Sequence, residues 1–381
     1  MPQAVLHHAA LPYRGGAVRV ARLLMAAQTA VGLDTCYSFE VPENDPEALG
    51  HNATGTDTSP PALPGEVGRV FAALPPDSAL HLHTSTHWPD LLTGLLGGVR
   101  GRRPLLTLHD ATPLTGGCAY PLDCPHFPAC AEPCPRQFPD ARSRQAEILG
   151  LLRAIAPLLV SPSGWLAGLA RQVLPDIPVR VIPNGVPWPE LSALPSRAHA
   201  RAGLGIAANA RVALFAAHGG ARAAYKSGPR WPEYWEVVEQ ALPVCLAYAV
   251  GGDETSGASR PDGLTVWPYV DRARLALLMR AADVLCYPTL ADNHPLVLLE
   301  AAALELPVAS FAVGGVPEIV AHGVTGLLAA PAGDVAAFAE AAQGLLRDKT
   351  LARRLGQNAR SRGVRRFTSG RMAADYAALL A

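Results

Sequence analysis

Apolar residues recur along this chain in short runs, separated by amphipathic stretches and by clusters of glycine and proline. Short apolar runs that are bounded by turn residues are typical of buried strands. The pattern predicts strands over residues 4–8, 35–41, 79–83, 105–109, 158–161, 179–183, 211–217, 245–250, 265–267, 284–287 and 308–311. It predicts helices between them, including residues 16–30 and 272–282. Repeated alternation of strand and helix indicates parallel sheets with helices on both faces.

The strand and helix pattern runs through two successive series, and a polar, proline-rich connector at residues 187–195 separates them. A chain of 381 residues is also too long for one ordinary domain. We therefore expect a first domain over residues 1–186, with a loop at 42–66, and a second over residues 187–366. A final amphipathic helix is expected over residues 367–381.

Composition excludes several classes of protein. Hydrophobic residues make up 49% of the chain, which is typical of a globular protein. The formal net charge of +0 argues against nucleic acid as the main partner, because a basic surface would be expected. No apolar run approaches the length of a bilayer span, and the first residues lack the features of a signal peptide. We expect a cytoplasmic protein.

The segment after the strand at residues 284–287 is the most informative part of the sequence. Pro288 ends the apolar run, and a helix-like segment follows with an acid at each end, Asp292 and Glu300. The two acids stand eight positions apart, about two turns if the segment is helical. Ligands of α/β proteins bind where strands end. We therefore expect both carboxylates to hydrogen-bond one ligand; a helix cap and a solvated acid are the alternative.

Two motifs in this segment carry a family resemblance. Asp292-Asn293-His294-Pro295, followed by Leu298-Leu299-Glu300-Ala301, resembles the acid-x7-Glu signature of retaining, nucleotide-sugar-dependent glycosyltransferases of the large family four. Asp followed by Asn is similar to a subgroup that builds bacterial surface polysaccharides. The resemblance implies the α/β GT-B fold: two Rossmann-like domains facing a central cleft, with a C-terminal helix that crosses back to the first domain.

The same resemblance implies roles for these residues. Glu300 would accept hydrogen bonds from the nucleotide ribose hydroxyls, and Asp292 would lie beside the donor sugar. Backbone N–H groups would meet the sugar and phosphate around Asn293, His294, Pro295 and Leu296.

The first domain offers two further candidates. Gly15 and Gly16 stand at the first strand-to-helix turn, where glycine lets a ligand approach the backbone closely. The family has a similar glycine pair near the donor diphosphate and the acceptor, whereas the simpler interpretation is a tight turn. His109 ends a predicted strand, and the family has a similar histidine lining the active site. The alternative for His109 is a structural role.

Cations and a second glycine pair complete the predicted donor site. The family uses an arginine and a lysine from a strand-end loop against the donor diphosphate, and Arg222 and Lys226 stand in a similar loop. Such cations would stabilise the charge on the leaving group, so no catalytic metal is expected. Gly314 and Gly315 precede a short helix that could hold a phosphate. Two solvated surface cations are the alternative for Arg222 and Lys226.

Four of the seven cysteines cluster in an insertion at residues 115–136 that resembles a Thr-Gly-Gly-Cys insertion of the polysaccharide subgroup. Four thiolates could hold one structural zinc ion in a loop with little core of its own. Unliganded thiols and redox pairs are the alternatives, since no Cys-x-x-Cys pair is present. The cysteines are Cys118, Cys124, Cys130 and Cys134.

One position departs from the family pattern, because Glu305 stands where the family usually has glycine. If Glu305 keeps a left-handed backbone, the conformation costs on the order of 1 kcal/mol.

These features together predict a retaining glycosyltransferase of surface polysaccharide biosynthesis. It would move a hexose-type sugar from a nucleoside diphosphate donor, with UDP favoured by family frequency, to a glycan or lipid-linked acceptor. The latter would involve peripheral contact with the inner face of the membrane. Two alternatives stay open: a GT-B-like nucleotide-sugar epimerase, which would need further acids and histidines for proton transfer, and a non-catalytic nucleotide-sugar-binding subunit.

Overall fold

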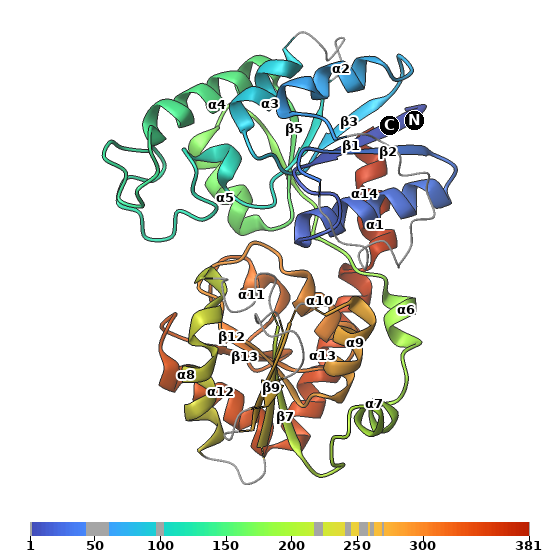
Figure 1. Cartoon of the computed structure of the whole chain (residues 1–381), viewed down its shortest axis with the longest axis vertical. Helices are drawn as coiled ribbons and strands as arrows, with labels where there is room; N and C mark the ends of the chain where they lie inside the picture. Colours follow the sequence, from blue (N-terminus) through green and yellow to red (C-terminus); the bar gives the residue numbers. More distant parts are fainter. Residues whose placement is uncertain are drawn as a thin grey trace. The chain divides into compact units, whose positions relative to one another are not determined.

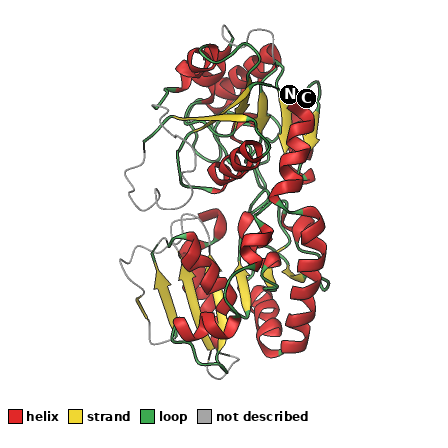
Figure 2. Ribbon diagram, turned by 90° about the vertical axis from the view of Figure 1, so that its right-hand side faces the viewer, coloured by secondary structure: helices red, strands yellow, loops and turns green. Residues whose placement is uncertain are grey.

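The computed structural model describes residues 2–42, 61–96, 103–216, 224–240, 245–250, 258–259, 263–268 and 270–380. The chain forms two compact units (Figure 1). Unit 1 comprises Met1–Asn184 together with Ser369–Ala381, and unit 2 comprises Gly185–Thr368. Each unit is an α/β structure in which helices flank a sheet (Figure 2).

Unit 1 contains a six-stranded parallel sheet with the strand order β2-β1-β3-β4-β5-β6. Its strands are β1 (Ala4–Ala9), β2 (Asp34–Phe39), β3 (Ala79–Leu82), β4 (Leu105–Thr107), β5 (Leu158–Ser161) and β6 (Val179–Val181). All six correspond to predicted strands, because each is a short apolar run bounded by turn residues.

The helices of unit 1 divide between the two faces of its sheet. Those that contribute to one large apolar cluster are α2 (Val67–Ala72), α3 (Trp88–Leu95), α4 (Ala141–Ile155) and α5 (Gly164–Val173). On the other face lie α1 (Gly16–Ala30) and α14 (Ser369–Leu380), which pack against each other. Short 3₁₀ turns occupy Pro64–Glu66 and Thr112–Leu114. The C-terminal helix therefore returns to the first unit, as the sequence predicted.

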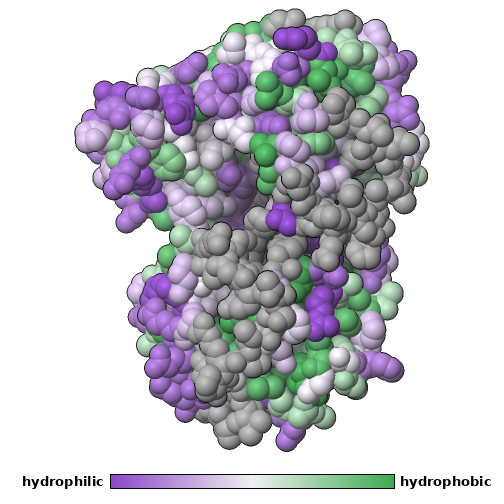
Figure 3. Space-filling model, viewed as in Figure 1, coloured by the Kyte–Doolittle hydropathy of each residue, from purple (hydrophilic) through white to green (hydrophobic). Residues whose placement is uncertain are grey.

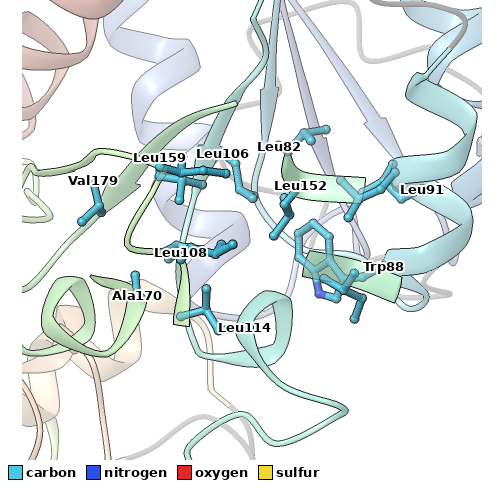
Figure 4. Close-up of a cluster of buried hydrophobic side chains, with 14 of the residues drawn as sticks. Leu82, Trp88, Leu91, Leu106, Leu108, Leu114, Leu152, Leu159, Ala170 and Val179 are labelled. Atoms are coloured by element: carbon cyan, nitrogen blue, oxygen red, sulfur yellow. The ribbon is translucent and has the colours of Figure 1, made fainter. Parts of the chain in front are cut away.

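Side chains alternate between the two faces along the central strands of unit 1. Leu82 of β3, Leu106 of β4 and Leu159 of β5 point into the apolar cluster (Figure 4). Trp88 and Leu91 of α3 and Leu152 of α4 complete this cluster. We call this side of the sheet the leucine face. Because successive strand residues point to opposite faces, the residues between these leucines face α1 and α14. That side carries histidines, as described below.

Unit 2 contains a seven-stranded sheet with the order β13-β12-β11-β7-β8-β10-β9. Its strands are β7 (Arg211–Ala216), β8 (Cys245–Val250), β9 (Ala258–Ser259), β10 (Leu264–Trp267), β11 (Val284–Tyr287), β12 (Val308–Phe311) and β13 (Gly326–Ala329). All neighbouring pairs are parallel except β9 and β10, which are antiparallel at one edge.

The helices of unit 2 are α6 (Trp188–Ser192), α7 (Arg197–Gly203), α8 (Trp231–Glu239), α9 (Arg272–Ala281), α10 (Leu296–Ala303), α11 (Val316–Ile319), α12 (Val335–Arg347) and α13 (Lys349–Arg366). Two 3₁₀ turns precede α8, at Ala224–Lys226 and Gly228–Arg230. A core of large side chains fills one side of the sheet, including Phe215 of β7, Trp235 of α8 and Phe338 of α12. These three rings are fully buried.

Two local elements were not predicted. Helix α6 lies within the proline-rich connector expected at residues 187–195, because Pro189 suits a first helical turn and Trp188 is buried. A side chain at Gly363 would come within 2.5 Å of the Trp188 ring, so that ring packs closely on α13. Strand β13 was not predicted; it pairs with β12 although its own run is short. Of the loop expected at residues 42–66, positions 43–60 lie outside the described residues.

The outer surface of unit 1 follows the amphipathic pattern of its helices. On α4, Arg142 and Glu147 are exposed, whereas Ile148 and Leu152 are buried in the core. Figure 3 shows hydrophilic residues gathered over this part of unit 1. Among the described residues, no helix is both long and apolar enough to cross a bilayer.

The backbone of Glu305 has the left-handed conformation that the sequence suggested, with φ = 58°. It follows α10, and its carbonyl oxygen lies where a side chain at Gly356 would stand, 2.0 Å from that β-carbon position. Its carboxylate forms a half-exposed ion pair with Arg360, with 3.6 Å between Nε and Oε1. Exposed pairs of this kind contribute little stability, so the backbone conformation dominates at this position.

We expect the substitution Glu305→Gly to raise the free energy of unfolding by about 1 kcal/mol, because glycine adopts this conformation without a β-carbon clash. Thermal and denaturant unfolding would measure the change. Glu305→Ala is the matched control, since it also removes the ion pair but keeps the β-carbon. Equal stability of the Gly and Ala variants would contradict this explanation.

Candidate active site

The candidate site of unit 2 lies where three neighbouring parallel strands end. Strands β7, β11 and β12 are adjacent in the sheet, with β11 in the middle. Because parallel strands point the same way, the segments that follow them meet at one edge. Leu290 after β11 donates its backbone N–H to the carbonyl of Tyr225, at 2.6 Å. This contact ties the segment that follows β11 to the 3₁₀ turn that ends at Lys226.

Lys226 and Asp292 form an ion pair at this edge. Nζ of Lys226 lies 3.2 Å from Oδ2 of Asp292, and the hydroxyl of Tyr287 donates to the same oxygen at 2.6 Å. The Asp292 side chain is 10% exposed and that of Lys226 is 26% exposed. The carboxylate is thus fixed by two donors, while the lysine retains some access to solvent. The structure brings together two residues that stand 66 positions apart in the sequence.

Gly314 and Gly315 pack directly on the backbone of Asp292. The N–H of Gly315 donates to the Asp292 carbonyl at 3.0 Å. Gly314 has φ = 54°, and a β-carbon there would lie only 2.2 Å from the same carbonyl oxygen. Any side chain at Gly314 would therefore displace the segment that carries Asp292, so glycine is required at this position by both conformation and packing.

One helix does not carry both acids, and that expectation is wrong. Helix α10 begins at Leu296 with Pro295 as its N-cap, so Asp292 lies in the preceding turn and only Glu300 is helical. The physical reason is Pro295, because the residue before a proline disfavours the helical backbone. Asn293 and His294 are buried in this turn, and the His294 ring packs edge-on against Phe367, with 5.5 Å between ring centroids.

Glu300 is buried in α10 and pairs with Arg272 at the start of α9. Nη2 of Arg272 donates to Oε1 of Glu300 at 2.9 Å, and Glu300 is only 4% exposed. Burial raises the pKa of Glu300 to about 7, although the Arg272 charge opposes that rise. Burial also lowers the pKa of Arg272, which the Glu300 carboxylate opposes. Glu300 is therefore not the solvated acid of the simpler interpretation.

In unit 1, Gly15 and Gly16 form the turn that starts α1. Gly15 is the N-cap with φ = 101°, a conformation that favours glycine. Gly16 has no such requirement, and within the described part of the chain a β-carbon at Gly16 would meet no atom within 4 Å. Neither backbone conformation nor packing among the described residues explains the glycine at position 16. A close ligand would explain it.

His109 belongs to a row of histidines on the side of the sheet opposite the leucine face. We call His7, His81, His83 and His109 the histidine cluster. Nε2 of His109 lies 3.0 Å from Nδ1 of His83, and Nε2 of His83 lies 3.1 Å from Nδ1 of His7. Burial lowers the pKa of His109 to about 3, so the ring is neutral at physiological pH. The sequence singled out His109 but not its chain of partners.

The four cysteines of the insertion line one small pocket, together with Phe127, Pro128 and other residues. The backbone N–H of Gly116 donates to Sγ of Cys130 at 3.3 Å. Burial raises the pKa of Cys118 to about 11, so this thiol is protonated unless a cation replaces the proton. Within the described residues, no three of these sulfurs form a group with all atoms within 4.8 Å. The zinc assignment stays a prediction.

Sequence reasoning missed two residues of the site, and one predicted residue lies outside the described part of the chain. Tyr287 and Arg272, which hold Asp292 and Glu300, were not singled out. The polar hydroxyl at the end of an apolar strand was a usable signal for Tyr287, whereas nothing local marks Arg272. Arg222 lies outside the described residues.

Comparison with known proteins finds a family similarity in unit 2. The profile of the family described as "Glycosyl transferases group 1" matches residues 257–362, which include Asp292, Glu300 and Gly314. This part of the chain is similar to the group 1 glycosyltransferases. It is also 40% identical over 119 residues to the D-inositol 3-phosphate glycosyltransferase of Mycobacterium avium. That match covers 28% of this chain and 28% of the length of that curated relative.

Two solved structures are similar in fold to the whole chain. The sucrose-phosphate synthase of Thermosynechococcus elongatus has a TM-score of 0.71 at 23% identity, over 99% of this chain and 98% of that one. The Anabaena protein HepE, solved in complex with UDP-glucose, has a TM-score of 0.73 at 18% identity, over 99% of each chain. At these identities the likeness shows the fold, and the predicted GT-B class is confirmed.

The raised pKa of Glu300 leads to a pH prediction. Because its folded-state pKa of about 7 exceeds its ordinary value of 4.5, the stability that protonated Glu300 contributes is complete below about pH 4.5. That stability is lost as the pH rises through about 7. Relative to Glu300→Gln, the wild type should lose at most about 3 kcal/mol of unfolding free energy between pH 5 and pH 8.

Denaturant unfolding of both proteins at several pH values would measure this difference. The isosteric Gln variant serves as the reference because it cannot ionise. A difference that is constant with pH, or that favours the wild type at high pH, would show that Glu300 does not have a raised pKa.

Proposed function

We propose that this protein is a retaining glycosyltransferase that moves a sugar from a nucleoside diphosphate sugar, a UDP-sugar, to a glycan or lipid-linked acceptor. We place it in surface polysaccharide biosynthesis, at the cytoplasmic face of the membrane. The observation that carries the proposal is the Lys226–Asp292 ion pair, held against Gly314 at the ends of β7, β11 and β12. The match of residues 257–362 to the group 1 glycosyltransferase profile and the UDP-glucose complex of HepE support the choice of donor.

In this proposal Lys226 binds the donor diphosphate. Its ammonium is the exposed member of the pair, so an incoming diphosphate can share it with Asp292. The start of α10 adds backbone N–H groups and the positive end of a helix dipole, which favour an anion. When the sugar–phosphate bond breaks, negative charge grows on the leaving diphosphate, and fixed positive groups stabilise it. This requires no catalytic metal.

Asp292 then contacts the sugar and Glu300 the nucleotide. Tyr287 and Lys226 occupy one oxygen of Asp292, which leaves the other to accept a hydrogen bond from a sugar hydroxyl. Glu300 accepts hydrogen bonds from the ribose hydroxyls, with Arg272 holding its carboxylate in place. A nearby cation and two hydroxyl donors favour the ionised form of Glu300, so donor binding would lower its pKa.

In unit 1, the residues proposed to contact a ligand are Gly15, Gly16 and His109. Gly16 admits a ligand close to the backbone, and neutral His109 hydrogen-bonds a phosphate or a sugar hydroxyl. The cysteine-lined pocket takes no part in the chemistry, and a structural zinc ion there would require Cys118, Cys124, Cys130 and Cys134 to come closer together than they do in this structure.

The first test is donor binding and transfer. In thermal-shift measurements, one nucleoside diphosphate sugar should raise the melting temperature. At a concentration one hundred times its dissociation constant, it should stabilise the folded protein by about 2.7 kcal/mol. Lys226→Met should remove most of that rise and lower transfer by about 100-fold or more, since it removes the diphosphate's cation. The chain has only two lysines, so exposed Lys349→Met is the matched control and should behave as the wild type.

Each other outcome has a definite meaning. A folded protein that responds to no donor contradicts both transfer and donor binding. A specific shift with neither transfer nor slow donor hydrolysis identifies a nucleotide-sugar-binding subunit. Conversion of the donor into an isomer identifies an epimerase.

The role of Gly16 can be tested separately. Gly16→Ala should leave the fold intact, because the β-carbon meets no described atom and alanine suits a helix start. It should weaken ligand binding or transfer by about tenfold or more, on the order of 1.4 kcal/mol, if a ligand occupies that space. Gly168→Ala, in α5 and equally open, is the control. Wild-type activity of Gly16→Ala would exclude a close ligand approach at this turn.

A further inference from the structure

The histidine cluster of unit 1 contains three buried rings whose nitrogens converge. His7 on β1 and His81 on β3 are directly paired in the sheet, and His83 follows His81 on the same face. Each of these rings offers a nitrogen, and the three nitrogens all lie within 4.8 Å of one another. The three side chains are at most 1% exposed. The proposed transfer reaction uses none of them.

One ring nitrogen of each of the three histidines forms a hydrogen bond with a different partner. Nε2 of His7 lies 2.8 Å from Oε1 of Gln28 on α1. Nε2 of His81 lies 2.8 Å from the Thr107 hydroxyl, which in turn lies 2.9 Å from the hydroxyl of Tyr376 on α14. Nδ1 of His83 lies 3.0 Å from His109. Metal-binding histidines typically have this arrangement, in which the second ring nitrogen is fixed by an outer hydrogen bond.

We call the second nitrogen of each ring its inner nitrogen. When each outer nitrogen carries its proton toward its partner, the inner nitrogens present three lone pairs: Nδ1 of His7, Nδ1 of His81 and Nε2 of His83. Within the described part of the chain, Nδ1 of His81 has no hydrogen-bond partner although it is buried. Leaving a buried polar atom unpaired costs on the order of 1–3 kcal/mol. A cation among the three nitrogens would satisfy all of them.

The spacing fits such an ion. Two nitrogens bound to one tetrahedral zinc ion at about 2.05 Å lie about 3.3 Å apart. The facing nitrogens of His7 and His83 are 3.1 Å apart. A neutral imidazole, with a lone pair on its inner nitrogen, is the form that binds a metal ion.

We propose that His7, His81 and His83 form a binding site for one transition-metal ion of the zinc class inside unit 1. Three imidazole nitrogens suit Zn²⁺, Co²⁺, Ni²⁺ or Cu²⁺ and do not suit Mg²⁺ or Ca²⁺, which prefer oxygen. Binding would also fix the proton of His83 on Nδ1, where it donates to Nε2 of His109. The neutral His109 ring would then carry its own proton on Nδ1. The site does not depend on the proposed transfer reaction.

The test compares metal content between two proteins. Wild type and His81→Phe are stripped with a chelator, incubated with Zn²⁺ and dialysed, and bound zinc is measured by mass spectrometry. Phenylalanine keeps the ring volume but has no nitrogen. The wild type should hold one zinc ion per chain more than His81→Phe, and Zn²⁺ should raise only the wild-type melting temperature through this site. His199→Phe, on the exposed side of α7, is the control and should match the wild type.

The comparison is independent of the cysteine pocket, because any zinc held there is present in both proteins. Equal zinc content in folded wild type and His81→Phe would overturn the proposal. If His81→Phe does not fold, X-ray absorption at the zinc edge of the wild type decides. Imidazole scattering supports the histidine site, whereas a shell of sulfur alone, or no bound zinc, overturns it.

Discussion

The parallel pairing of β11 with both β7 and β12 is the constraint on which the candidate donor site depends. It makes three strands end at one edge, so that Lys226, Asp292 and Gly314 meet although long segments separate them. The contacts there are close: the Gly314 backbone leaves no room for a β-carbon against the Asp292 carbonyl. Loss of register in β11 would move Asp292 away from its partners, because one residue of slip reverses which side chains face the helices.

Unit 1 uses its sheet asymmetrically. The leucine face is an ordinary apolar core, whereas the face toward α1 and α14 buries His7, His81 and His83 together with Thr107 and Tyr376. Burying so many polar rings is unfavourable unless they are hydrogen-bonded, and most of their nitrogens are. Among the described residues, Nδ1 of His81 and Nε2 of Gln28 have no hydrogen-bond partner, so the network is incomplete at these two atoms. A polar core that needs no ion would have all of its buried nitrogens paired. The unpaired nitrogen of His81 therefore supports the proposed cation site.

Much of the local structure was predictable. The strands of unit 1 follow from apolar runs bounded by turn residues, and the left-handed backbone of Glu305 follows from a family position that is usually glycine. Local signals failed where packing overrode them. Helix α6 forms within the expected connector because the Trp188 ring packs on α13. Residues Gly326–Ala329 form strand β13 because they pair with the edge of β12.

The sequence by itself determined the two-series α/β plan, the acids Asp292 and Glu300 and the cation Lys226 as candidates, and the glycine turn before α1. These depend on period and turn chemistry, which act over a few residues. Only the tertiary structure decided that Lys226 pairs with Asp292, that Arg272 holds a buried Glu300, and that His7 meets His81 and His83. Those contacts depend on strand order and on which side of each sheet a helix covers. The hydrophobic pattern of the sequence does not specify strand order or the side of the sheet that each helix covers, because the same strands in any parallel order would show the same pattern.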